Sequence, residues 1–288
     1  MSRRRELDQH RHQLEEIGEI MRSMKSLAYM ETRKLSRLLE AQGQAVSVIE
    51  AAAADFLGFH PGLASAARSP CRVILLIGSE RGFCGDFNEA LLRALPAGAE
   101  TDTRIIAVGS RLCSRLQERD GTATLLAGPG AAEEVSDTLN RLVTVIGQLQ
   151  DEQAWISLTV LHHRNGATDL EEKLLLPPFA TGIDPRDRRY GHAPLLNLQP
   201  EAFFAELVEH YLLAVLHAIV YTSLMAENQR RIQHLEGAIR RLDEKSFEYS
   251  RQSRILRQEE ITEEIEVILL SAEGLDASMP PEGTRRGV

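Results

Sequence analysis

The chain has 288 residues, of which 43% are apolar and only 5% aromatic, a composition that favours one α/β core with extended helices over two dense globular domains. The net charge of -9 and the pI near 5.6 argue against a general affinity for nucleic acid, because phosphate binding needs a surface rich in lysine and arginine. No apolar run approaches the roughly 18 to 20 residues of a membrane-spanning helix, so we expect no direct membrane span and a membrane link only through a partner.

The first segment, residues 1–58, is predicted to be one long coiled-coil helix. Between Leu7 and Leu57 there is no proline, and apolar or small residues recur at alternating steps of three and four. The members of this stripe are Leu7, Leu14, Ile17, Met21, Met24, Ala28, Leu35, Leu38, Ala45, Ile49, Ala52 and Phe56. A stripe that repeats every seven residues requires a partner helix.

Residues 70–178 are predicted to form an α/β domain. Short runs rich in β-branched and aliphatic residues, which favour strands, alternate here with helical stretches. The expected strands are 72–77, 104–108, 122–126, 156–161 and 172–176, and the expected helices are 87–95, 111–119 and 131–149. This alternation implies crossover connections and a mostly parallel, Rossmann-like sheet. Residues 179–200, which are dense in proline, glycine and charge, read as a linker.

A second coiled-coil helix is predicted over residues 201–275, with a flexible tail at 276–288. The same stepping of apolar residues returns here, and at about 1.5 Å of rise per residue the helix could be on the order of 100 Å long. Because the α/β domain lies between the two helices in sequence, the helices can pair as an antiparallel coiled coil. Polar residues interrupt the apolar stripes and make the pairing adequate rather than optimal: Glu31, Gln42, Asn228, Ser246 and Ser253.

One loop invites an enzymatic interpretation. Gly78, Gly82 and Gly85 lie between a predicted strand and a predicted helix, where backbone N–H groups can cradle a phosphate. Their spacing matches neither G-x-G-x-x-G nor G-x-x-x-x-G-K-[ST], so a tight turn is the favoured reading and a nucleotide-binding α/β enzyme the weaker alternative. Cys84 beside Arg81 could have a lowered pKa, but no histidine follows nearby, and we expect a structural thiol.

No metal site, cofactor or catalytic residue is expected in the chain itself. His162 and His163 are adjacent, so on a strand they point to opposite faces and cannot hold one metal ion together. Cys71, Cys84 and Cys113 show no C-x-x-C spacing. Their odd number, in a chain that starts with charged rather than apolar residues, favours reduced thiols in a cytoplasmic environment.

Several segments, taken together, resemble the gamma subunit of F-type ATP synthases. They are IMRSMKSLA at 20–28, SERGFCGDFN at 79–88, AENQRRIQHLEGA at 226–238 and RQEEITEEIEVILLSAEGL at 257–275. The resemblance implies that both termini form a shaft inside a ring of alpha and beta subunits, with the α/β domain outside it near the epsilon subunit and the membrane c-ring. In that family the protein does no bond chemistry. Its asymmetric shaft biases each catalytic subunit between open and closed states as it turns.

The resemblance also implies which residues bind the catalytic ring. Arg257, Gln258 and Thr262 correspond to polar residues that contact the inner loops of the catalytic subunits. Arg231 and Glu227 match charged positions lower on the same helix.

On the N-terminal helix, Met24 corresponds to a methionine that faces this contact, with Arg22 and Lys25 beside it. Departures from the family in the glycine-rich loop, and the tail at 276–288, mark a divergent member, of the kind suspected to move Na⁺ instead of H⁺. The membrane ring chooses that ion, so the coupling ion stays open. The implied location is the cytoplasmic face of the bacterial inner membrane, and the alternative from another class is a coiled-coil scaffold without an ATPase.

Overall fold

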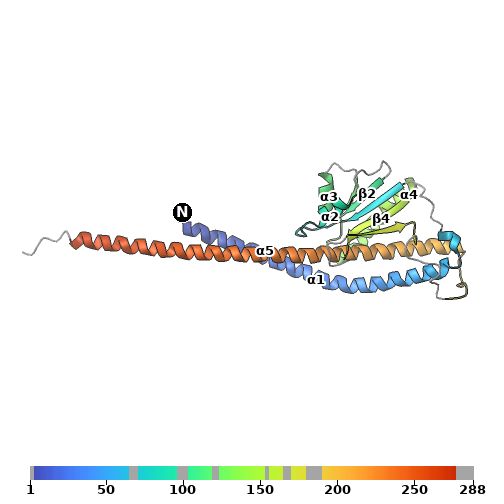
Figure 1. Ribbon diagram of the computed structural model, residues 1–288, viewed down its shortest axis with the longest axis horizontal. Coiled ribbons are helices and arrows are strands. Elements are labelled where there is room, and N and C mark those ends of the chain that lie inside the picture. The colour runs from blue at the N-terminus through green and yellow to red at the C-terminus, as the bar shows by residue number, and fades with distance from the viewer. Residues whose placement is uncertain are drawn as a thin grey trace, which may run out of the picture. The chain divides into compact units, whose positions relative to one another are not determined.

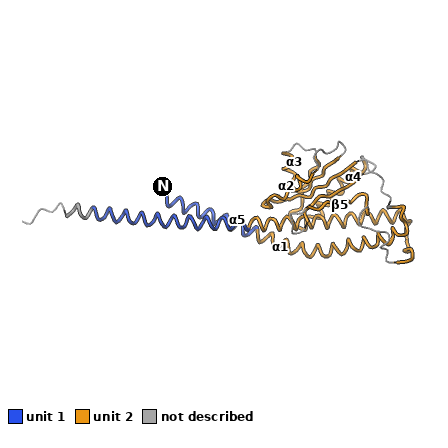
Figure 2. The backbone as a smooth tube through the Cα atoms, viewed as in Figure 1, with its two compact units in different colours: residues 1–24, 236–288 blue, residues 25–235 orange. Residues whose placement is uncertain are grey.

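The computed structural model describes residues 3–64, 71–95, 103–118, 123–152, 156–164, 170–179 and 190–276. Two long helices, α1 (Arg3–Leu57) and α5 (Pro200–Asp276), flank an α/β segment in the chain (Figure 1). Contacts divide the chain into two compact units (Figure 2). We call residues 1–24 with 236–288 the helix-pair unit, and residues 25–235 the sheet unit. Because this division runs through both long helices, the domain boundaries expected from the sequence stay a prediction.

The sheet unit is built on a five-stranded sheet with the order β3-β2-β1-β4-β5. Its strands are β1 (Cys71–Ile77), β2 (Thr103–Val108), β3 (Ala123–Leu126), β4 (Ile156–His163) and β5 (Leu170–Leu176). β1 pairs in parallel with β2 and β4, β2 pairs in parallel with β3, and β5 runs antiparallel to β4. The mostly parallel sheet expected from the sequence is confirmed, and all five expected strands are present. Position 122, expected in the third strand, lies outside the described residues.

The shorter helices fall where the sequence places them. They are α2 (Phe87–Ala94), α3 (Ser110–Gln117) and α4 (Val135–Glu152), with the 3₁₀ turns η1 (Pro61–Ala64) and η2 (Ala132–Glu134). The expected helix over 131–149 is thus a 3₁₀ turn followed by α4, and the expected end of the second helix at 119 lies outside the described residues.

Alternation along β1 sorts its side chains between two apolar layers. Val73 and Leu75 belong to the main core, which they share with buried residues of α4, α5 and α1. Ile74 and Leu76 point to the other face and pack with α2 and α3. Both faces of the sheet are therefore covered, as a parallel sheet requires, and Figure 1 shows the helices on either side of the strands.

Within the sheet unit, α1 and α5 run antiparallel. The Gln42 side-chain amide donates to the Ala214 carbonyl oxygen at 2.9 Å, and the rings of Phe56 and Phe203 lie 4.8 Å apart. As the residue number rises along α1, the number of its partner on α5 falls.

The helix-pair unit has the same direction of pairing. An Arg4 guanidinium nitrogen lies 3.0 Å from a Glu260 carboxylate oxygen, and an Arg22 nitrogen lies 2.7 Å from Asp243. The antiparallel coiled coil expected from the two apolar stripes is confirmed in each unit.

The expectation that no segment reaches the length of a membrane span was wrong. Within Pro200–Leu270 of α5, one window is long and apolar enough to cross a bilayer by length and composition, and 33% of it is buried in the chain. Leu207, Tyr211, Val215 and Ile219 of the same helix belong to the main core of the sheet unit. Packing against the sheet therefore accounts for part of the apolar character of α5.

Candidate functional site

The glycine-rich loop between β1 and α2 is tightly constrained. A Cβ at Gly78 would lie 2.4 Å from the Cβ of Leu112, so only glycine permits this approach of the loop to α3. Phe83 and Gly85 both have a φ of 64°, in the left-handed region. Gly78 and Gly85 therefore permit close packing and a tight turn, as we predicted from the sequence.

Glu227 of α5 occupies the backbone N–H groups of this loop. The N–H of Glu80 donates to Glu227 Oε2 and the N–H of Arg81 donates to Glu227 Oε1, both at 3.1 Å. The Glu227 residue is only 3% exposed. Burial raises the pKa of its carboxyl group, and Arg231 and the two N–H donors oppose that rise. Amides that could hold a phosphate thus already hold a carboxylate of the chain itself, which argues against the nucleotide-binding alternative.

Arg231, one helical turn after Glu227, completes this arrangement. Its guanidinium donates to the Glu227 carboxylate, to the Gly82 carbonyl oxygen at 3.1 Å and to Asn228 Oδ1 at 2.7 Å. Arg231 is buried. Glu227 and Arg231 therefore form their hydrogen bonds with groups of the chain itself. Their direct contact with a catalytic ring stays a prediction.

Two further carboxylates cap backbone N–H groups in the sheet unit. Glu80 Oε2 accepts hydrogen bonds from the N–H of Ser110, the first residue of α3, at 2.8 Å and from the N–H of Gly128 at 2.7 Å. Glu31 of α1 accepts one from the N–H of Ala132 at 2.6 Å. Carboxylates suit helix N-termini because the free N–H groups there carry partial positive charge. Sequence reasoning missed both roles, and its only signal was Glu31 as an irregularity in the apolar stripe.

The thiols and the paired histidines of the sheet unit have structural surroundings. Cys84 donates to Ser79 Oγ at 3.3 Å, and burial raises the pKa of its thiol, which is the opposite of what a nucleophile needs. His163 Nε2 lies 2.8 Å from the Phe87 carbonyl oxygen, and burial lowers the pKa of His163 and of its neighbour His162. The surroundings of Cys84 are those of the structural thiol expected from the sequence.

The polar residues predicted to contact a catalytic ring lie on the surface of the helix-pair unit. Arg257, Gln258 and Thr262 are all exposed. Thr262 Oγ1 donates to the Gln258 backbone carbonyl oxygen at 2.9 Å. Arg257 forms no ion pair with any residue that the structure describes.

The predicted residues of α1 lie at another level of the helices. Arg22 forms ion pairs with Glu19 and with Asp243 of α5. Arg257 lies further along α5, close in sequence to Glu260, which pairs with Arg4 near the start of α1. Met24 and Lys25 are half-buried, and the division between the two units falls between them. The structure therefore does not gather the predicted residues of α1 and α5 into one cluster within the helix-pair unit.

Directly after the polar residues, α5 carries an exposed apolar run. Its large apolar side chains are between 47% and 68% exposed: Ile261, Ile265, Val267, Ile268, Leu269 and Leu270. Just before this run, Arg4 of α1 donates to Glu260 of α5 at 3.0 Å. We call residues 257–270 the α5 tip, which combines polar side chains with an apolar surface.

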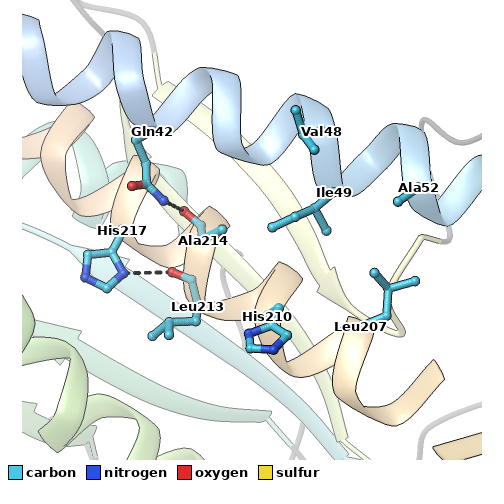
Figure 3. Close-up of a pocket in the computed structure, with 9 residues that line it drawn as sticks. All are labelled: Gln42, Val48, Ile49, Ala52, Leu207, His210, Leu213, Ala214 and His217. Carbon is cyan, nitrogen blue, oxygen red and sulfur yellow. Dashed lines mark hydrogen bonds between the residues drawn. The ribbon is translucent and has the colours of Figure 1, made fainter. Parts of the chain in front are cut away.

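A separate groove lies between α1 and α5 in the sheet unit (Figure 3). It has a volume of about 430 Å³ and is lined mainly by apolar side chains such as Ile49 and Leu207, with His210 and His217 at its polar positions. The hydrogen bond from Gln42 to the Ala214 carbonyl oxygen crosses one end of it. Two of these polar residues, Gln42 and His217, hydrogen-bond to backbone carbonyl oxygens of α5, those of Ala214 and Leu213, both at 2.9 Å.

Comparisons with known proteins agree with this architecture. A family model described as ATP synthase matches residues 3–275. A chain of the Euglena gracilis mitochondrial ATP synthase (OSCP/F1/c-ring, rotational state 3) is 15% identical with a TM-score of 0.63, covering 99% of this chain and 98% of that one. A chain of the Tetrahymena thermophila mitochondrial ATP synthase (central stalk/c-ring) is 16% identical with a TM-score of 0.53, covering 76% and 99%. No curated protein matches the sequence. At these identities the solved structures show a shared fold.

Proposed function

This chain belongs to the gamma-subunit family of ATP synthases, and from that membership we propose that the α5 tip is the part that meets the catalytic ring. The chain is the non-catalytic central-stalk subunit, or rotor, which couples ion flow across a membrane to ATP synthesis or hydrolysis. Arg257, Gln258 and Thr262 make the polar contacts in this proposal, and Arg22, Met24 and Lys25 of α1 contact the ring at a second level.

The surface of the α5 tip carries this proposal. An apolar run of this length, more than half exposed at most of its positions, needs a cover in the assembled protein. A surrounding apolar sleeve fits it, because apolar contacts of this kind have no direction and let a helix turn. The exposed polar residues beside the run can form pairs worth about 0.2 to 1 kcal/mol each, weak enough to break and re-form at every turn.

We propose alpha and beta subunits as the ring around the α5 tip, and the c-ring and an epsilon subunit as partners of the sheet unit. Support comes from the solved structures that share the fold, which are chains of ATP synthase assemblies, one with F1 and a c-ring and one with a central stalk and a c-ring. The complex is membrane-associated, and we propose the cytoplasmic face of a bacterial inner membrane as its location. H⁺ or Na⁺ is the transported ion.

Substitutions in the α5 tip test this proposal in the assembled complex. Arg257→Ala or Gln258→Ala should lower coupled ATP turnover by up to about fivefold, the equivalent of one surface pair, without changing the melting temperature of the chain. The matched control is Arg254→Ala, one turn earlier on α5, where the arginine hydrogen-bonds within its own helix, to Ser250. Unchanged turnover in Arg257→Ala and Gln258→Ala complexes would remove these residues from the contact.

A further inference from the structure

The glycine-rich loop is attached to α5 through one carboxylate. We propose that Glu227 is a positioning residue for rotary coupling, because its carboxylate is the built-in anion that binds the loop amides and makes the loop move with α5. The inference rests on the rotor function proposed above, but its structural part concerns only the loop and α5. It differs from the family-based expectation, in which Glu227 contacts a partner.

The geometry joins three consecutive loop residues to one turn of α5. Each oxygen of the Glu227 carboxylate accepts one N–H, from Glu80 and from Arg81. Arg231, four residues later and therefore on the same face of the helix, binds the next carbonyl oxygen, that of Gly82. Side chains of α5 thus bind two backbone N–H groups and one backbone carbonyl oxygen of the loop. A shift of α5 must therefore displace the loop or break these three hydrogen bonds.

The energetic cost of burying the Glu227 carboxylate indicates that it has a role beyond packing. A buried carboxylate is costly unless charged and hydrogen-bonding partners compensate it, and an apolar side chain of the same size is often as stabilising. Here Glu227 receives two N–H donors and a guanidinium, all in a buried setting. Directional bonds of this kind fix an orientation, which non-directional apolar packing does not.

The loop that the Glu227 carboxylate holds contains a strained and partly exposed residue, Phe83. Phe83 has a φ of 64°, a conformation that costs free energy for a residue with a Cβ, and its side chain is 43% exposed. Its ring lies 6.4 Å from that of His234, two turns after Glu227 on α5. A strained residue persists only where its surroundings hold it, and the bonds at residues 80 to 82 lie immediately before it.

Chemical rescue and hydrogen exchange test this role together. In the full-length chain, Glu227→Ala should make the amides of Glu80 and Arg81 exchange about tenfold to a hundredfold faster, the equivalent of losing hydrogen bonds to a charged acceptor. Added formate supplies a free carboxylate and should slow them again. In vesicles with the assembled ATP synthase, the ions taken up per ATP hydrolysed should fall in Glu227→Ala and partly recover with formate, and not with chloride at equal ionic strength.

Two further variants make the result decisive. Glu206 is an exposed glutamate earlier on α5, and Glu206→Ala is the matched control. In this variant the exchange rates of the Glu80 and Arg81 amides and the ion uptake per ATP should equal those of the unsubstituted protein, with and without formate. Glu227→Gln keeps the side-chain volume if Glu227→Ala does not fold, and it replaces one of the two acceptor oxygens with an NH2 group, a donor that cannot accept from the loop N–H facing it.

Each outcome decides between the alternatives. Unchanged exchange at Glu80 and Arg81 in both Glu227 variants overturns the attachment of the loop. Faster exchange with unchanged uptake per ATP, or a parallel loss of hydrolysis and uptake that formate does not restore, overturns the positioning role. If the unsubstituted chain does not assemble with catalytic subunits, the rotor proposal itself fails, and the exchange data still report on the loop.

Discussion

The helices α1 and α5 pair in both units, but they pair through different chemistry. In the helix-pair unit the contacts between them include exposed charged groups, such as Arg4 with Glu260, whose side chains are 38% and 41% exposed. In the sheet unit the same helices contribute residues that are fully buried, such as Leu35 and Leu235. One repeating pattern in the sequence therefore leads to two kinds of surface.

The difference follows from the number of layers. Two helices alone can bury one narrow stripe on each, so the remaining faces stay in water. In the sheet unit, a sheet and α4 add further layers, and the apolar stripe of α5 widens into the main core. The sheet unit therefore carries its own stability, whereas the helix-pair unit has exposed surface that binding partners can cover and thereby stabilise.

The largest expected effect separates buried from exposed charge. Arg231→Ala leaves the Glu227 carboxylate buried without its guanidinium, and we expect the free energy of unfolding to fall by about 3 to 5 kcal/mol. Arg230→Ala is the matched control, because this neighbouring arginine is partly exposed and lies 3.9 Å from the exposed Asp86. Its effect should stay within about 1 kcal/mol. Urea unfolding of the purified chain, followed by circular dichroism, measures both, and equal effects would contradict the contrast between the two arginines.

A matched pair of leucines tests the same contrast with apolar side chains. Leu75 is fully buried in the sheet unit and Leu269 is 59% exposed in the α5 tip. Leu75→Ala should lower the free energy of unfolding of the isolated chain by about 2 to 5 kcal/mol, and Leu269→Ala should change it by about 0.5 kcal/mol or less. The comparison becomes sharper in the assembled complex. There Leu269→Ala should weaken assembly if a sleeve covers the α5 tip, and an unchanged complex would argue against such a cover.

The polar residues in the two apolar stripes show what could not be predicted from the sequence. Glu31, Gln42, Asn228 and Ser253 interrupt a coiled-coil pattern, and from the pattern alone they indicate no more than weaker pairing. Each has a specific partner in the structure: the Ala132 N–H, the Ala214 carbonyl oxygen, Arg231 and Asp8, respectively. Three of the four partners lie more than 100 residues away in the chain. A local pattern detects such a residue as a defect but contains no information about a distant partner.

The strands and helices were predictable for the opposite reason. Strand β1 is a short continuous run of β-branched and aliphatic residues, and α4 repeats Val135, Leu139, Leu142 and Ile146 on one face, so local sequence is enough to find them. Glu227 and Arg231 are the contrasting case. Their spacing of four residues is typical of a solvated helix face, and they are instead buried and hydrogen-bonded to a loop about 146 residues away in sequence.

The smallest expected effect concerns the exposed pair Arg22 and Asp243, which joins α1 to α5 in the helix-pair unit. A double-mutant cycle with Arg22→Ala and Asp243→Ala should give a coupling free energy of about 0.2 to 1 kcal/mol in the isolated chain. The value should fall as salt is added, because ions screen charges that are in contact with water. A coupling above about 2 kcal/mol, or one that salt does not change, would mean that this pair is desolvated like the pair in the sheet unit. The two units would then differ in the number of their layers but not in the chemistry by which α1 and α5 are held together.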